Sequence, residues 1–510
     1  MIYRCDFSAL SPTQHIIISL ASVTAITFGI AVLSKSTRNK EKDPPYTSDS
    51  ISETILGMTS PHAPFFMETR AKTYGLVFRL FLPIWDTWYI VCDPALARLV
   101  FEGDSSLSIK ASDKPPHVMD RFSAVTDNIP FLFSKQTDGG NWEIPRKGLA
   151  PSFSQINLNK RMIQFQEKAN EFCSILDKHV ANDIILEDIS EWLVKLTIDF
   201  ISTSMFDRDF KCLSGEMDPD VKEFVKELPF AEREVFSKQA INPLRPLMFW
   251  NKDVKRLKKS AKGFIKMAKN MLDEHRKKLI AWEASGHRDD GSMLLSRMIS
   301  TSYISEDERA ADVIGFLIAG HDTTAYQLSF IILEICKDKR VREKLQSELD
   351  SVITSPLEPI THDHITQLTY LSYVVKEVMR LFPVAAQGSV RKAFQDIETD
   401  KYIIYKGCTI LIPMYAMFRS ATTIREPTSF IPERWEAGDS EEKQLQELMM
   451  PFALGKRNCI GQNLAKMEIH MLTAMLFRRY NFELVSEVYY DYFLVLRPIN
   501  ANLKVTSRLK

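Results

Sequence analysis

One cysteine in this chain lies in a sequence that favours chemistry at sulfur. Cys459 stands between Gly455 and Gly461, and an apolar run that predicts a helix begins at Gln462. Free backbone N–H groups and the positive end of that helix would stabilise a thiolate and lower the thiol pKa. The glycines let the backbone approach a bulky group bound at sulfur, and Arg457 offers a cation for a carboxylate. The pattern predicts a thiolate ligand or nucleophile, with an ordinary buried thiol as the alternative.

A second group of reactive side chains lies inside a predicted helix at 308–337. The segment from Ala319 to Thr324 reads Ala-Gly-His-Asp-Thr-Thr. Glycine in a helix interior costs about 1 kcal/mol relative to alanine, so this weak point needs a reason. The pair Asp322 and Thr323 could move protons, although such a pair alone is commonly a cap or a surface feature.

The elements that must position these residues are mostly helices. Helical periodicity predicts helices at 157–180, 252–280, 308–337, 340–350 and 366–381, and β-like stretches lie at 76–81, 88–92, 401–404 and 409–412. The expected fold class is therefore mainly α with small β-sheets. Because no linker-like composition follows residue 46, we expect one large domain over 46–510.

Composition excludes several classes of protein. Lys+Arg and Asp+Glu both number 65, so the formal net charge is zero, which argues against a protein that coats nucleic acid. The chain is 45% hydrophobic and 25% charged, as globular proteins are. Its 7 cysteines are widely spaced without a Cys-x-x-Cys pair, which argues against a disulfide scaffold or a multi-cysteine zinc module.

The amino terminus predicts a membrane anchor. After a short segment, 1–15, residues 16–33 form an uncharged apolar stretch, and at about 1.5 Å per residue a helix there would just cross a thin bilayer. A basic, proline-containing linker follows at 34–45, and this positive cluster predicts that the remainder stays cytoplasmic. A cleaved signal peptide is the alternative interpretation.

The segment Lys252–Lys278 predicts a basic amphipathic helix. It carries 11 Lys/Arg against three acids, and its apolar residues fall on one face: Val254, Leu257, Ala261, Phe264, Ala268 and Met271. An apolar patch, 246–250, lies just before it. A surface helix packed on the core explains the pattern, and a second membrane contact is the functional alternative.

The segment from Phe452 to Gly461 resembles the Phe-x-x-Gly-x-Arg-x-Cys-x-Gly signature of the cytochrome P450 family, position by position. The resemblance implies the P450 fold after the anchor and a haem b whose iron takes the Cys459 thiolate as its axial ligand. It also implies that Phe452 packs near the macrocycle and that Arg457 pairs with a propionate.

Other motifs extend the resemblance to roughly residues 46–510. The segment 319–324 resembles the family's distal helix, where a local distortion opens a groove for dioxygen. There Thr323 would hold water, Asp322 would lead to bulk protons, and His321 would face away from the haem. Trp142, Arg146 and Arg391 match haem-propionate residues. The family's structural ion triad is matched by Glu377, Arg380 and Arg434.

The function implied by the resemblance is monooxygenation of a lipophilic small molecule at a C–H or C=C bond. The motifs are most similar to microsomal, fungal-type members that tailor terpenoids or polyketides. Implied partners are a separate NADPH-cytochrome P450 reductase, cytochrome b5 and the endoplasmic reticulum membrane, with a single span, a cytoplasmic catalytic domain and no nucleic acid. A basic docking face would comprise Arg146, Lys147, Lys456 and Lys466.

Two other functions remain open from the sequence. One is a haem-thiolate isomerase or dehydratase that consumes no O₂, and the other is a non-catalytic haem or lipid carrier. We expect substrate contacts from five regions, namely 107–133, the segment before Trp250, 316–319, 384–387 and 489–493.

Overall fold

The structure is a computed structural model that describes residues 41–82, 86–106, 109–137, 141–235, 244–355, 357–420, 424–436 and 438–508. The predicted segments 1–15 and 16–33, and most of the linker 34–45, lie outside the described residues. None of the helices within the described ranges combines the length and apolar character that a membrane crossing requires.

Helices dominate the described chain, as the sequence predicts. In the first half they are α2 (Ile51–Thr59), α3 (Ala63–Tyr74), α4 (Pro94–Glu102), α5 (Pro116–Phe122), α6 (Glu143–Leu149), α7 (Gln155–Asn159), α8 (Met162–Ala181), α9 (Ile189–Phe206), α10 (Pro219–Arg233) and α11 (Lys252–Ala284). The second half contains α12 (Leu294–Ser300), α13 (Glu306–Lys337), α14 (Lys339–Val352), α15 (His362–Gln367), α16 (Thr369–Leu381), α17 (Met414–Ser420), α18 (Glu442–Leu448) and α19 (Gln462–Arg479). The predicted helix at 157–180 is divided between α7 and α8.

The strands form one four-stranded sheet and several two-stranded pairs. The larger sheet has the order β1-β2-β8-β5, in which β2 and β8 are parallel and the other neighbours antiparallel. Its strands are β1 (Val77–Leu82), β2 (Asp86–Val91), β5 (Ser389–Lys392) and β8 (Thr409–Ile412). The smaller pairs are β3 (Gly103–Asp104) with β4 (Ile109–Lys110), β6 (Ile397–Glu398) with β7 (Ile403–Ile404), β9 (Tyr480–Leu484) with β12 (Leu503–Ser507), and β10 (Tyr489–Tyr492) with β11 (Leu496–Ile499).

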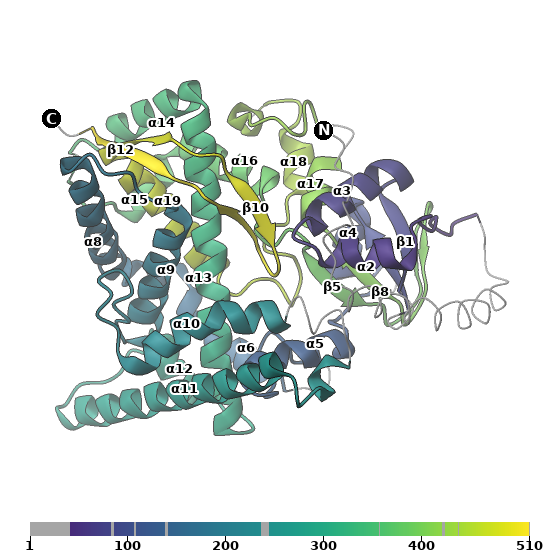
Figure 1. Ribbon diagram of the computed structural model, residues 1–510, viewed down its shortest axis with the longest axis horizontal. Coiled ribbons are helices and arrows are strands. Elements are labelled where there is room, and N and C mark those ends of the chain that lie inside the picture. The colour runs from purple at the N-terminus through teal and green to yellow at the C-terminus, as the bar shows by residue number, and fades with distance from the viewer. Residues whose placement is uncertain are drawn as a thin grey trace.

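These elements gather into two regions with separate hydrophobic cores. Figure 1 shows the larger sheet with α2, α3 and α4 at one side of the molecule, and the long helices α8, α9, α11 and α13 at the other. The smaller core lies between the larger sheet and its helices, around residues such as Phe78, Ile90 and Leu411. The expectation of a mainly helical fold with small sheets is confirmed.

The central element is α13, which is buried along most of its length. The Ser305 side chain accepts a hydrogen bond from the Glu308 N–H, and three acidic residues occupy the first turn, where they complement the helix dipole. The helix then passes through the larger core, as expected for a helix that is apolar on nearly all sides.

The predicted basic amphipathic helix is α11. Its apolar face is buried at Leu257, Ala261, Phe264, Ala268 and Met271, and the helix packs against α10 and α13. The interpretation as a surface helix packed on the core is therefore confirmed.

Candidate functional site

The loop that carries Cys459 is shaped by backbone hydrogen bonds and by one close approach. The Cys459 N–H donates to the Phe452 carbonyl at 2.9 Å, and the Asn458 N–H donates to the Gly455 carbonyl at 3.1 Å. Gly455 has a φ of 71°, and a Cβ there would lie 2.5 Å from the Phe101 carbonyl oxygen. Because a backbone atom cannot move aside easily, only glycine fits this turn.

The sulfur of Cys459 lies just before α19, but its acidity differs from the sequence expectation. Solvent reaches the residue through a cavity that it lines, yet burial among protein atoms raises the thiol pKa above its ordinary value. The Gly461 N–H and the cations Arg146 and Lys114 oppose that rise without overcoming it. The predicted lowering of the pKa is therefore wrong, because the sequence reveals the donors and not the desolvation.

The cavity has a volume of about 810 Å³ and brings the predicted residues together. Its lining includes the Cys459 loop, the 319–324 segment of α13, and side chains from α5, α6 and β5. Every residue predicted to bind the cofactor or to move protons lines it: Trp142, Arg146, Asp322, Thr323, Arg391, Phe452, Arg457 and Cys459.

Five basic side chains line this cavity, and four of them, which interact electrostatically with one another, are only partly neutralised. Arg391 and Lys114 are buried, and Arg457 and Arg146 are half-buried. Asp113 faces Arg457 at 4.0 Å, but its oxygens also accept the Lys114 and Thr137 N–H groups. The cluster of cations thus lacks matching acids.

The pKa values of three of these cations are lowered by burial, and two of them are lowered further by the neighbouring cations. Burial lowers the pKa of Arg391 and of Arg457 to about 10, and for Arg457 the other arginines add to the effect. Burial also lowers the pKa of Lys114 well below its usual range, helped by Arg457 and Arg391. The Nη1 atom of Arg457 is buried without a hydrogen-bond partner. A dianionic ligand group would relieve both the charge repulsion and the unmade hydrogen bond.

Aromatic side chains complete the lining near the cysteine loop. The Arg457 guanidinium lies 4.5 Å from the centre of the Trp142 ring, and Arg146 donates to the Asn458 side chain at 2.6 Å. Phe452 carries the carbonyl that anchors Cys459, and its ring faces the Lys466 ammonium at 5.4 Å. Arg146 therefore belongs to the cavity, whereas the other residues of the expected docking face, Lys147, Lys456 and Lys466, are exposed.

Close packing of two helices explains the glycine in the 319–324 segment of α13. A Cβ at Gly320 would lie 2.2 Å from the Cδ1 atom of Ile201 on α9, so the glycine allows these two helices to approach. The helix is continuous here, and the Thr323 hydroxyl donates to the Ala319 carbonyl at 2.9 Å. Such a bond to the preceding turn slightly weakens a helix.

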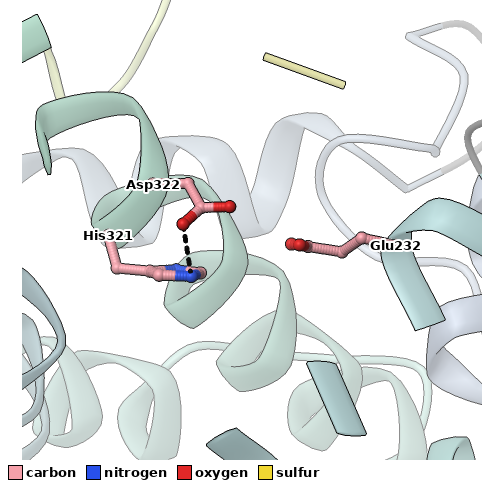
Figure 2. Close-up of side chains that lie close together, drawn as sticks. All are labelled: Glu232, His321 and Asp322. Carbon is pink, nitrogen blue, oxygen red and sulfur yellow. Dashed lines mark ion pairs between the residues drawn. The ribbon is translucent and has the colours of Figure 1, made fainter. Parts of the chain in front are cut away.

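The neighbouring residues His321 and Asp322 form an ion pair on α13. The His321 Nε2 atom lies 3.0 Å from Asp322 Oδ1, and His321 Nδ1 lies 2.7 Å from the Leu317 carbonyl oxygen. His321 does not line the cavity, whereas Asp322 does. Figure 2 shows the pair facing Glu232 of α10.

The three residues of the expected ion triad are brought into contact. Arg380 donates to both Glu377 oxygens at 3.0 and 2.8 Å, and Arg434 donates to Glu377 at 2.9 Å. All three side chains are fully buried. Glu441 adds a second carboxylate, 2.7 Å from Arg434, so the buried charges balance.

Four of the five regions that we expect to contact substrate line the cavity. The contributing side chains are Val118, Met119, Phe122, Phe131, Phe316, Ile318, Val384, Gln387, Tyr492 and Phe493. The segment before Trp250 differs, because none of its described residues 244–250 lines the cavity. Leu247, Phe249 and Trp250 are instead exposed on the surface.

Sequence reasoning missed several charged residues around this site, among them Arg121 and Asp312, which also line the cavity. Lys114 and Glu232 come from distant segments without a motif, so no local signal marks them. Glu468 lines the cavity from α19, and burial raises its pKa to about 8. A glutamate on the apolar face of a helix, in line with Leu464, Met471 and Leu472, is a signal that could have identified it.

Comparison with known proteins agrees with this geometry. The family model for cytochrome P450 matches residues 54–498. The chain belongs to the cytochrome P450 family. Similar proteins include "Protein LUTEIN DEFICIENT 5, chloroplastic" of Arabidopsis thaliana, 27% identical over 81% of this chain and 68% of that protein. Cytochrome P450 3A5 of Homo sapiens is 28% identical over 68% of each chain, and cytochrome P450 3A41 of Mus musculus is 26% identical over 85% and 84%.

The fold comparison gives the same family. The crystal structure of a cytochrome P450 titled CYP102L1 superposes with a TM-score of 0.74 at 19% identity, and the match covers 88% of this chain and 98% of that one. The expected P450 fold is confirmed, and family membership makes the chain a haem-thiolate monooxygenase, an oxidoreductase. The cavity fits haem, since it combines a sulfur donor, aromatic walls and cations with an unpaired guanidinium nitrogen.

Proposed function

We propose that this chain inserts one oxygen atom from O₂ into a C–H or C=C bond of a lipophilic small molecule, in the biosynthesis of a secondary metabolite such as a terpenoid or polyketide. The observation that carries the proposal is that one cavity holds the Cys459 sulfur, the four basic side chains and the Asp322–Thr323 pair. Overall, the substrate, one O₂, one NADPH and one proton give the hydroxylated or epoxidised product, one water and NADP⁺.

The residues around Cys459 hold the cofactor. Cys459 would provide the thiolate ligand, and coordination to the metal would favour loss of the proton from a thiol whose pKa burial has raised. Arg146, Arg391 and Arg457 would bind the propionates, together with Lys114, while Trp142 and Phe452 would pack beside the ring. Bound haem would supply O₂ activation, which an electron-donating thiolate favours.

The residues of α13 handle protons. Rotation of the Thr323 hydroxyl away from the Ala319 carbonyl would allow it to bind a water molecule in the cavity. Asp322 lies next to it at the cavity wall and transfers protons towards that water. The aromatic and aliphatic lining orients an apolar substrate and excludes bulk water.

The triad supports the site indirectly. Glu377, Arg380 and Arg434 join α16 to the segment that leads to the Cys459 loop. Because their charges balance without solvent, they fix that connection in one arrangement.

The proposals for the electron donor and for the location of the protein rest on the family resemblance and on exposed side chains. We propose NADPH-cytochrome P450 reductase as the electron donor and cytochrome b5 as a second partner, with Lys147, Lys456 and Lys466 as exposed cations for acidic partner surfaces. The segment 16–33 would hold the chain in the endoplasmic reticulum membrane with its catalytic domain in the cytoplasm. The exposed patch at Leu247, Phe249 and Trp250 would rest on the same membrane.

The test is reconstitution of the full chain with haem, the reductase and NADPH under ¹⁸O₂, using metabolites from cells that lack the gene. Products that carry one ¹⁸O atom support the proposal. Conversion that proceeds without O₂ and NADPH would support an isomerase or dehydratase instead, and reversible ligand binding without any product would support a carrier. For location, full-length chain should resist alkaline extraction from microsomes, and release of it would contradict the anchor.

A further inference from the structure

Glu232 is a buried acid that the proposed function leaves without a task. It lies in the last turn of α10, is 1% exposed, and its Oε1 atom has no hydrogen-bond partner. Burial, and then the charge of Asp322, raise its pKa well above the ordinary value. A carboxylate buried without a partner is costly, so the protonated form of Glu232 is favoured.

Glu232 faces an ion pair on α13. One ligating atom each of Glu232, His321 and Asp322 lies within 4.8 Å of the others, and Figure 2 shows the Glu232 carboxyl pointing towards the pair. Burial opposes a charge on His321, but the neighbouring Asp322, 3.0 Å away, raises its pKa to about 9. The imidazolium thus donates one N–H to Asp322 and the other to the Leu317 carbonyl.

The carboxyl groups of Asp322 and Glu232 differ in their access to the cavity and in their surroundings. Asp322 lines the cavity, and its Oδ1 atom lies 3.0 Å from His321 Nε2. Glu232 does not line the cavity but holds a proton beside Asp322. A pair of carboxyl groups with different environments is a common source of one acid and one base.

We propose that Glu232 is the proton source behind Asp322, and that each proton entering the distal side of the cavity passes from the Glu232 carboxyl to the Asp322 carboxylate. The O–H bond of Glu232 breaks, an O–H bond forms on Asp322, and the negative charge moves from Asp322 to Glu232. Because Glu232 acts through Asp322, it is a positioning residue. The inference rests on the proton-transfer role of Asp322 in the proposed function.

Neighbouring groups allow the charge to move and the proton to return. Arg497 of β11 stabilises a charged Glu232, so the acid can ionise for a time. Arg497 pairs with Asp491 at 2.6 Å, and Asp491 also accepts from Arg233, whose side chain is 46% exposed. These charged side chains extend from the neighbourhood of Glu232 to the surface, and water from that side would return the proton to Glu232.

The same three residues could instead bind a divalent cation, since carboxylate and imidazole are common metal ligands. Two observations favour proton transfer. His321 must be neutral to ligate, but here both its nitrogens act as donors, and the nearby Arg497 repels a metal ion. Metal binding is therefore an outcome that the test must detect.

The variants are Glu232→Gln and Asp322→Asn, with Glu227→Gln as the matched control. Glu227 lies on the same helix but pairs with Arg256 and Ser260 of α11, so its substitution removes a carboxyl group without touching the cluster. The first readout is infrared spectroscopy of the purified chain at pH 7, which detects a protonated carboxyl group independently of turnover. Glu468, with its pKa raised to about 8, contributes to the same C=O absorption, so we expect equal absorption in the wild type and in Glu227→Gln and a decrease by one carboxyl group in Glu232→Gln.

The second readout is NADPH oxidation by the holoenzyme with purified reductase, without substrate, in H₂O and D₂O. Glu232→Gln should slow NADPH oxidation about tenfold, less than the hundredfold or more of a positioned acid because water replaces it in part. It should also release more peroxide per NADPH and show a larger solvent isotope effect. The double variant with Asp322→Asn should be no worse than Asp322→Asn alone.

Three results would overturn the proposal. These are a carboxyl band unchanged in Glu232→Gln, wild-type kinetics in that variant while Asp322→Asn is impaired, or one equivalent of a divalent metal that Glu232→Gln loses. If Asp322→Asn itself behaved as wild type, the proton-transfer role in the proposed function would fail, and the infrared result would still report on Glu232 alone.

Discussion

Removal of the Glu377 charge should destabilise the fold far more than removal of a surface charge. Glu377 is fully buried and accepts hydrogen bonds from Arg380, Arg434 and the Trp435 indole. In Glu377→Gln only one carboxylate, Glu441, would remain for two buried guanidinium groups. Glu441 contacts Arg434, so Arg380 would lose its carboxylate partner. Arg380 would keep backbone carbonyl partners and the neutral amide oxygen of the new side chain, but no carboxylate.

The expected loss is about 3–5 kcal/mol, the usual cost of leaving a buried charge uncompensated. Since total stability is about 5–15 kcal/mol, the variant should unfold at a much lower urea concentration and retain little haem after purification. The control is Glu343→Gln, which breaks an exposed pair with Lys339 and should cost less than about 1 kcal/mol. Urea unfolding followed by circular dichroism measures both. A loss in Glu377→Gln no greater than in the control would refute the reasoning.

Three further predictions follow from single residues. Gly455→Ala should lose about 1–3 kcal/mol in urea unfolding, because its φ of 71° and the Phe101 carbonyl leave no room for a Cβ; unchanged stability would contradict this. Arg391→Leu should leave the apoprotein equally or more stable, since burial lowers the pKa of this cation to about 10, yet release haem about tenfold faster. Stopped-flow transfer to apomyoglobin measures haem release, and equal rates in the wild type and in Arg391→Leu would contradict this prediction. His321 has its pKa raised from about 6.5 to about 9, so its protonation stabilises the fold fully below pH 6.5 and the stabilisation is lost as pH rises through 9. Urea unfolding between pH 6.5 and 9.5 should therefore show a steeper loss in the wild type than in His321→Asn, and parallel curves would disprove it.

Local patterns predicted the elements that carry the site. The strands β1, β2 and β8 and the helices α11 and α13 follow from residue periodicity, because each buries one face or all faces in a core. The motif around Cys459 predicted the family because its spacing reflects a turn that only glycine at 455 can form. The ion triad was predicted from the family resemblance, since only Glu377 and Arg380 lie one helical turn apart and Arg434 lies on a different segment.

Distant contacts could not be predicted. Lys114 and Glu232 have no motif of their own, and they reach the site only because α5 and α10 fold against it. The direction of the Cys459 pKa was missed for the same reason, since donors are visible in sequence while burial depends on the whole fold. Arg146 was expected on the docking face as well as at the cofactor, but its hydrogen bond to Asn458 directs it to the cavity.

The central claim is that the Cys459 sulfur binds the haem iron. The direct measurement is the absorption spectrum of the reduced CO complex, recorded for the wild type and for Cys459→Ser. The wild type should show the strongly red-shifted Soret band of thiolate ligation, and the variant should lack it. A wild-type spectrum typical of imidazole ligation, or a variant that keeps the red-shifted band, would contradict the claim.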